Sequence, residues 1–465
     1  MALDAQVNWT VSMAENYEKV VGKRNRVHQK AAEEDGASNR LLDKFPGVLR
    51  RSLDHTVPPF DVPDEIVLVI VEFLWHGAHW VRGVQGTLAS CCRVSDQWRR
   101  VAMPFLYYKP YLYGNNFDLF IRTMCPSING RVRRSPLEGL VKILDMSNLV
   151  HQGGKVMTAR LLGRVKGSLE EFTAPVATFG INCLPALSKS VNMKALDLTL
   201  VSECPPMTSL FNAVERLNNL RTLRLPRSAG FGSSAEKGGT MLQRPQLRWP
   251  SNLRDLTISG GLDWNYYSGT ISFPSTIEHL AIEHCPRATG HAIWSTIEWA
   301  HINSSRLTSL TLRSLPRVAP DEFDWLLVRF PTLLRLSVSV DYITPNFFDK
   351  RHEVPEGYAI QFIELTDSGT PGNDEKVEPL DVIMGQEDGA FPSLRAMTVA
   401  TTLRWDSQAG HGGEVQTLHE RFEELAKEDW EAREGLFRDM DDREYKKGWR
   451  VINPGVFRRG VAEAR

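Results

Sequence analysis

The sequence has few cysteines, no excess of charge of either sign and no long apolar run. Six cysteines occur among 465 residues without any Cys-x-x-Cys spacing, which argues against a disulfide framework and predicts reduced thiols in a cytoplasmic or nuclear protein. The 55 Lys and Arg residues balance 56 Asp and Glu residues, so the concentrated positive charge that nucleic-acid binding requires is absent. The longest apolar run, Ile66 to Val71, is too short to span a bilayer, so no membrane partner is expected.

Motifs for catalysis, cofactors and metals are also missing. The sequence contains no His-Glu-x-x-His, no Gly-x-Ser-x-Gly and no Gly-x-Gly-x-x-Gly after a strand pattern. Gly153-Gly154-Lys155 lacks the upstream glycine of a phosphate loop, and Val156 stands where Ser or Thr would hold magnesium. We therefore expect a binding protein with no catalytic residue, no cofactor and no metal.

One phrase, apolar-x-x-apolar-x-apolar, recurs from the middle of the chain nearly to its end. Clear copies, 24 to 33 residues apart, centre on Leu196, Leu223, Leu256, Leu280, Leu310 and Leu336. Looser copies centre on Leu144, Phe172, Ile363 and Met397. The alternation of the last three positions is that of a strand with one buried face. This period predicts a stacked repeat, an architecture that displays a long binding surface.

The segments between the copies support an alternation of strand and helix. Four copies follow an aromatic residue and a proline: Trp249-Pro250, Phe273-Pro274, Phe330-Pro331 and Phe391-Pro392. The proline ends the preceding element, and the aromatic ring is expected to pack between neighbouring coils. Helical patterns lie between copies, as in Met207 to Leu217 and Glu322 to Phe330.

This α/β pattern resembles the irregular leucine-rich repeats, which form a horseshoe-shaped solenoid with strands inside and helices outside. The resemblance covers residues 141–402, and an ordinary doubly wound α/β sheet is the alternative. Two glycine-rich segments, Arg227 to Arg248 and Asp367 to Ala390, are expected to be loops.

A different pattern occupies residues 58–112. It opens with Val62-Pro63-Asp64-Glu65-Ile66, continues with Ile70 and Leu74 at helical spacing, and ends with Cys91-Cys92-Arg93-Val94 shortly before Trp98-Arg99. Ile66, Ile70 and Leu74 predict one apolar helix stripe that so short a unit cannot bury alone. Trp75 to Gly86 predicts a long turn between the first two helices. The pattern resembles an F-box, the short helical domain that precedes leucine-rich repeats in fungal-type F-box proteins.

The resemblance implies a function and a set of partners. An F-box followed by leucine-rich repeats is similar to the substrate receptors of SCF ubiquitin ligases, in which the F-box docks on a Skp-type adaptor, and through it a cullin, while the repeats hold a target protein. The residues that would form or support the adaptor contact are Val62, Pro63, Ile66, Ile70, Leu74, Leu88, Val94 and Trp98. The open alternative is a repeat scaffold outside any ligase, whose amino-terminal helices only cap the first coil.

Candidate target-binding residues follow from the repeat geometry. The residue between the last two apolar positions of each copy points away from the core, and exposed aromatics are favoured anchors. The candidates are Asp197, Arg224, Thr257, Thr311 and Ser337 on the strands, with Trp264, Tyr266 and Tyr267 in the loop after Ile258. Packing of these three aromatics against the neighbouring coil is the equal alternative.

The remaining segments complete the expected domain order. Residues 1–57 are predicted to be mostly disordered, with one helix at about Asn39 to Arg51. Residues 113–140 are expected to be a helical linker. Residues 403–465 are expected to form a charged cap and tail, in which Val415, Leu418, Phe422 and Leu425 have helical spacing.

Overall fold

The computed structural model describes residues 62–77, 81–114, 116–126, 135–149, 154–229, 248–262, 273–367, 377–405 and 411–434. The chain divides into two compact units, Met1–Met193 and Lys194–Arg465. The predictions for residues 1–57, including the helix at Asn39 to Arg51, lie outside the described residues.

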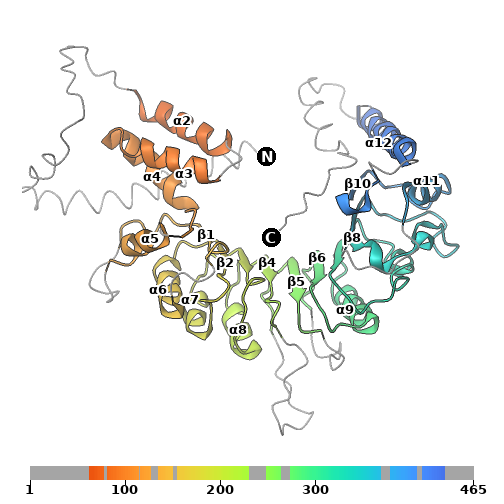
Figure 1. The fold of residues 1–465 in the computed structure, drawn as a ribbon, viewed down its shortest axis with the longest axis horizontal. Helices are drawn as coiled ribbons and strands as arrows, with labels where there is room; N and C mark the ends of the chain where they lie inside the picture. The colour runs from red at the N-terminus through yellow and green to blue at the C-terminus, as the bar shows by residue number, and fades with distance from the viewer. Residues whose placement is uncertain are drawn as a thin grey trace, which may run out of the picture. The chain divides into compact units, whose positions relative to one another are not determined.

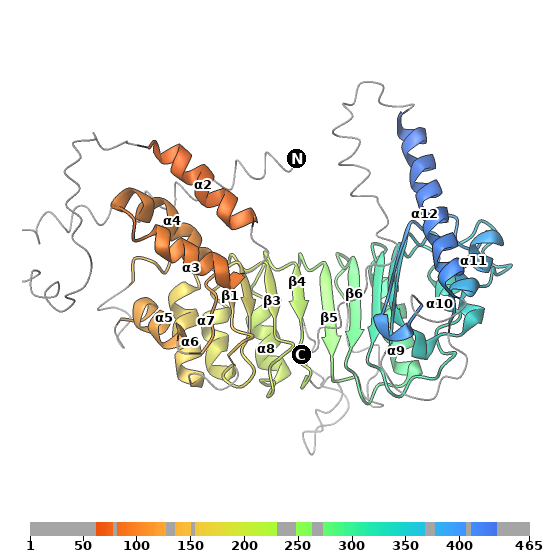
Figure 2. The same cartoon turned by 45° about the horizontal axis from the view of Figure 1, so that its top comes forward.

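The first unit begins with three helices that lie side by side (Figures 1 and 2). Its elements are α2 (Asp64–Gly77), α3 (Val81–Cys91), α4 (Asp96–Tyr108), α5 (Asn116–Met124), β1 (Ile143–Asp145), α6 (Lys155–Val165), β2 (Glu171–Thr173), η3 (Ile181–Cys183) and α7 (Leu184–Leu187). Strands β1 and β2 pair in parallel, with Leu144 opposite Phe172.

The second unit is a parallel array of strands and helices. Its elements are β3 (Ala195–Asp197), α8 (Met207–Val214), β4 (Thr222–Arg224), β5 (Asp255–Ser259), β6 (His279–Glu283), α9 (Gly290–Asn303), β7 (Ser309–Arg313), α10 (Leu326–Arg329), β8 (Arg335–Ser339), η5 (Val340–Tyr342), η6 (Pro345–Phe348), β9 (Phe362–Thr366), α11 (Pro379–Glu387), β10 (Ala396–Val399), η7 (Thr401–Leu403) and α12 (His411–Glu434). Strands β3 to β10 pair in sequence order, all parallel. In Figure 1 they follow the inner side of a curved array, with α8, α9 and α11 on its outer side.

The predicted strand positions are confirmed. Each central residue of the ten copies lies in a strand and is at most 1% exposed: Leu144, Phe172, Leu196, Leu223, Leu256, Leu280, Leu310, Leu336, Ile363 and Met397. A doubly wound sheet would reverse its strand order at a switch point, and β3 to β10 contain no reversal. The fold class is therefore α/β, with parallel strands alternating with helices as in a leucine-rich-repeat solenoid.

The aromatic residues that precede proline pack between successive coils, as predicted. Their side chains are mostly buried and meet aromatic rings from neighbouring repeats. The ring centroids lie 6.0 Å apart for Trp249 and Phe273, 6.1 Å for Trp294 and Phe330, and 5.7 Å for Phe348 and Phe391. These stacked and tilted pairs stabilise the junctions between coils.

The long turn expected at Trp75 to Gly86 is wrong, because α2 continues to Gly77 and α3 already begins at Val81. Val84 and Leu88 lie four residues apart and are both buried, so they place one face of α3 against the core. Gly83 and Gly86 obscure this pattern in the sequence, because glycine disfavours helix.

The helix predicted over Glu322 to Phe330 is also shorter than expected, since only Leu326–Arg329 is helical. The backbone N–H of Phe323 donates to the Tyr342 carbonyl, which belongs to the following repeat. The Asp324 carboxylate accepts from the backbone N–H of Thr344 at 2.8 Å and from its hydroxyl at 2.6 Å. These contacts tie the segment to the following repeat instead of to a longer helix.

The loop expected at Asp367 to Ala390 contains helix α11. The Asp381 carboxylate accepts from the Glu378 backbone N–H at 2.7 Å and caps the helix start, which the acidic composition concealed. The helical spacing near the carboxyl terminus is confirmed in α12, where Leu418 and Phe422 are fully buried. Most of the loop expected at Arg227 to Arg248 lies outside the described residues.

The chain leaves three successive strands through a residue with left-handed backbone geometry. Gly260 after β5 has φ +72°, and His284 after β6 and Ser314 after β7 have φ +54°. Only glycine fits the first position, because a Cβ atom there would lie 2.0 Å from the Arg227 carbonyl oxygen. The repeated turn gives these three strands the same exit.

Candidate functional site

Helices α2, α3 and α4 form a helical module with its own core. The fully or nearly buried side chains of this core are Val67, Val71, Val84, Leu88, Cys91, Ala102 and Phe105. Trp75 closes one end with edge-on contacts to Phe105 and Tyr108, at centroid distances of 6.1 and 5.8 Å. The module therefore has its own apolar core, and the opposite side of α2 takes no part in that core.

Polar contacts fix the orientation of α2 and α4 in this module. The Ser95 hydroxyl caps α4 by accepting from the Trp98 backbone N–H at 3.2 Å. The Gln97 side-chain amide donates to the Val62 carbonyl and, at 2.7 Å, to the Asp64 carboxylate. The start of α2 is thus tied to the first turn of α4.

Helix α2 exposes a large apolar surface, which we call the outer face of α2. It consists of Ile66 (51% exposed), Val69 (59%), Ile70 (40%) and Phe73 (76%). These positions follow helical spacing and lie opposite Val67 and Val71, which are fully buried in the module core. A contiguous apolar surface of this kind is typical of a protein-binding site.

The predicted adaptor-contact residues divide into two groups. Pro63, Ile66, Ile70 and Val94 are exposed. The others face the module core, Leu88 fully buried and the rest partly so: Val62, Leu74, Leu88 and Trp98. The single stripe expected from Ile66, Ile70 and Leu74 is wrong, because Leu74 packs against the core while the two isoleucines face away from it.

Sequence reasoning missed Val69 and Phe73. Every residue from Ile66 to Val71 is apolar, so the helix has no polar face from which its inner and outer sides could be told apart. The available signal was Phe73 itself, a large aromatic residue directly after Glu72.

Two rows of side chains cross the inner surface over all the strands from β3 to β10, at positions set by the strand register. The first row is Ala195, Thr222, Asp255, His279, Ser309, Arg335, Phe362 and Ala396. The second row is Asp197, Arg224, Thr257, Ala281, Thr311, Ser337, Glu364 and Thr398. Both rows are mainly polar and cross the array perpendicular to its strands.

The predicted target-binding residues differ in how far their side chains are exposed. Arg224 is exposed and its guanidinium lies 3.2 Å from the Asp197 carboxylate. Thr257 and Thr311 are half-buried on the same row. Ser337 is buried, and its hydroxyl accepts from Arg313 at 2.7 and 3.0 Å, so it positions that arginine. Trp264, Tyr266 and Tyr267 lie outside the described residues.

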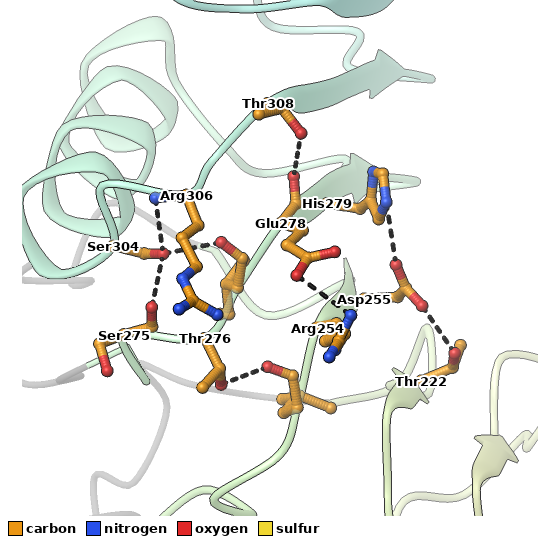
Figure 3. Close-up of polar contacts among 12 residues, drawn as sticks. Thr222, Arg254, Asp255, Ser275, Thr276, Glu278, His279, Ser304, Arg306 and Thr308 are labelled. Carbon is orange, nitrogen blue, oxygen red and sulfur yellow. Dashed lines mark hydrogen bonds and ion pairs between the residues drawn. The ribbon is translucent and has the colours of Figure 1, made fainter.

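The first row was missed by the sequence reasoning, which considered only the position after the central leucine. Figure 3 shows Asp255 between its two partners in this row. Its carboxylate accepts from the Thr222 hydroxyl at 2.9 Å and lies 3.5 Å from His279 Nε2. Arg254 and Glu278 form a separate ion pair of 3.3 Å beside them. The signal that could have revealed this row is the alternation of the strand itself.

The cysteine thiols are unpaired and largely buried. Burial raises the pKa of Cys285 to about 12 and that of Cys92 and Cys204 to about 11, so these thiols stay protonated at neutral pH. Among the described residues there is no cluster of three His, Cys, Asp or Glu side chains that could hold a metal ion. The helices within that part of the chain include none long and apolar enough to cross a membrane.

Two proteins from yeasts are similar to this chain. The F-box protein YDR306C of Saccharomyces cerevisiae is 28% identical over 341 residues, which are 72% of this chain and 66% of that protein. The protein pof5 of Schizosaccharomyces pombe is 26% identical over 331 residues, which are 70% of this chain and 86% of that protein. The chain thus spans just under two thirds of the first relative. No protein-family model matches the chain.

Proposed function

We propose that this chain is the substrate-recognition subunit of an SCF-type ubiquitin ligase in the cytoplasm or nucleus. The outer face of α2 docks on a Skp-type adaptor, which links the chain to a cullin, and the repeats hold a target protein. The chain itself forms no covalent bond. It raises the effective concentration of the target at the ubiquitin-transferring subunits.

The observation that carries this proposal is the division of α2 into two apolar faces. One face completes the module core, so the module does not need the other face for its folding. These four side chains are 40% to 76% exposed, so burying the remainder would contribute roughly half of the ~1.5 to 3 kcal/mol that complete burial of such a side chain gives. The distant similarity to an F-box protein supports the same assignment.

The test is co-purification of the complete chain with a purified Skp-type adaptor. Ile70→Asp and Phe73→Asp place a charge on the outer face of α2 and are expected to abolish adaptor binding while the helical circular-dichroism signal persists. Leu119→Asp, at an exposed apolar residue of α5 in the same unit, is the matched control and should bind normally.

A second variant separates binding from folding. Val67→Asp puts a charge in the module core and is expected to lose both the adaptor and helical signal. Leu74→Asp is less informative, because Leu74 packs against the core. A folded wild-type chain that does not bind the adaptor would overturn the proposal and favour the scaffold.

A further inference from the structure

Several charged side chains on the inner surface of the second unit, or beside it, neutralise one another. Asp197 pairs with Arg224, Arg254 with Glu278, and Arg313 with Glu364. Arg313 reaches from β7 across β8 to β9, with its guanidinium also held by the Ser337 hydroxyl. These pairs leave little net charge over much of the surface.

Asp255 and Arg335 are exceptions in the first row. Asp255 contacts the Thr222 hydroxyl and the imidazole of His279, and no lysine or arginine within the described segments forms an ion pair with it. Arg335 is exposed, and its guanidinium lies 5.0 Å from the centre of the Phe362 ring. None of the described carboxylates pairs with Arg335. The stretch of this row from Asp255 to Arg335 therefore has one acidic and one basic end.

The register fixes how far apart these two charges stand. Asp255 on β5 aligns with His279 on β6, Ser309 on β7 and Arg335 on β8. Adjacent strands lie about 4.8 Å apart, so three spacings separate the charged residues by about 14 Å. The intervening His279 and Ser309 are half-buried, and the adjacent second row is small, with Ala281 and Thr311.

This spacing matches an extended polypeptide. An extended chain advances about 3.4 Å per residue and returns a side chain to the same face every second residue, so 14 Å corresponds to four residues. We propose that the row Asp255, His279, Ser309 and Arg335 binds an extended segment of the target with a Lys or Arg four positions from an Asp or Glu. This inference rests on the proposed function, because it assigns the repeats the role of holding the target.

Neighbouring charged groups do not neutralise the negative charge at Asp255 or the positive charge at Arg335. Arg254 stands next to Asp255 in sequence, but its guanidinium is engaged by Glu278 (Figure 3). Glu283 is half-buried at the other end of β6, four residues beyond His279, where the register sets it opposite Arg313 and not beside Arg335. Glu364 is held by Arg313 and so is not available to neutralise Arg335.

The experiment selects peptides on the complete chain bound to its adaptor, from a phage library of random 12-residue peptides. The wild-type protein is expected to enrich peptides with one basic and one acidic residue four positions apart. Asp255→Lys should instead enrich two acidic residues at that spacing, and Arg335→Glu two basic residues. A synthetic copy of an enriched wild-type peptide should bind each variant about tenfold more weakly or worse.

The control is Arg317→Glu, which makes the same charge change at an exposed residue after β7 and should leave the selected pattern unchanged. Failure to enrich peptides, or a charge pattern that does not follow the variants, would overturn the inference. All variants should retain the adaptor. Loss of adaptor binding by the wild type would count against the proposed function itself, so the two failures are distinguishable.

Discussion

The helical module and the repeat array place their apolar side chains in opposite ways. In the repeat array, each strand buries its central apolar residue and presents mainly polar side chains on the inner surface. In the module, α2 is apolar on both sides and exposes Ile66, Val69, Ile70 and Phe73. Apolar residues therefore stabilise the fold in the repeat array, whereas those on the outer face of α2 are available for binding another protein.

The contrast predicts that the same kind of truncation has different effects in the two regions. Leu280→Ala in β6 removes a fully buried side chain and should lower the free energy of unfolding by about 2 to 5 kcal/mol in urea titrations. Phe73→Ala should change it by no more than about 0.5 kcal/mol, yet weaken adaptor binding. Equal losses of stability would contradict the division of roles.

Replacing one glycine in each region by alanine should change stability in opposite directions, because the two glycines differ in backbone conformation and in the space around them. Gly260→Ala in the array forces a left-handed residue against the Arg227 carbonyl and should destabilise the protein by about 1 to 3 kcal/mol. Gly86→Ala lies in the middle of α3, where an added Cβ meets no atom within 4 Å, and should stabilise the module by about 0.5 to 1 kcal/mol. Thermal unfolding of both variants checks the opposite signs.

The smallest expected effect concerns a buried carboxyl group of the array. Burial raises the pKa of Asp324 above its ordinary value, so the folded state holds this proton more tightly than the unfolded state does. The stabilisation that results is present below pH 3.8 and is lost as the pH rises through the folded pKa. The stability of Asp324→Asn relative to wild type should therefore increase from pH 4 to pH 7 in denaturant titrations. The opposite trend would contradict this interpretation.

The positions of the strands could be predicted because one buried face imposes the same spacing on every repeat. Leu256 and Leu280 occupy equivalent buried places, and the aromatic residue and proline before each mark the junction. The faces of α2 could not be predicted, since Val67 and Ile70 are chemically alike and only packing against α4 separates them. The helix predicted over Glu322 to Phe330 was too long for a related reason, because the contacts of Phe323 and Asp324 with the following repeat leave no trace in the local pattern.

The candidate sites were predictable to a similar extent. The module could be located, but half of its predicted contact residues turned toward the core. On the array, the importance of Arg335 depends on Arg313 taking Glu364 from two strands away, which no local pattern reveals. The strand register decides which side chains from different strands meet. That register cannot be read from the sequence of one strand alone.

In the second unit, each strand pairs only with the strands before and after it in sequence. This arrangement determines whether the proposed binding row keeps its structure when the terminal repeats unfold locally. A one-dimensional array loses order from its ends, because terminal coils have a neighbour on one side only. Strands β5 to β8 stand in the interior of the sequence-ordered run from β3 to β10, with two strands on either side. Local unfolding of β10 and α12 would therefore leave the row from Asp255 to Arg335 folded, because β9 still separates this row from the unfolded end.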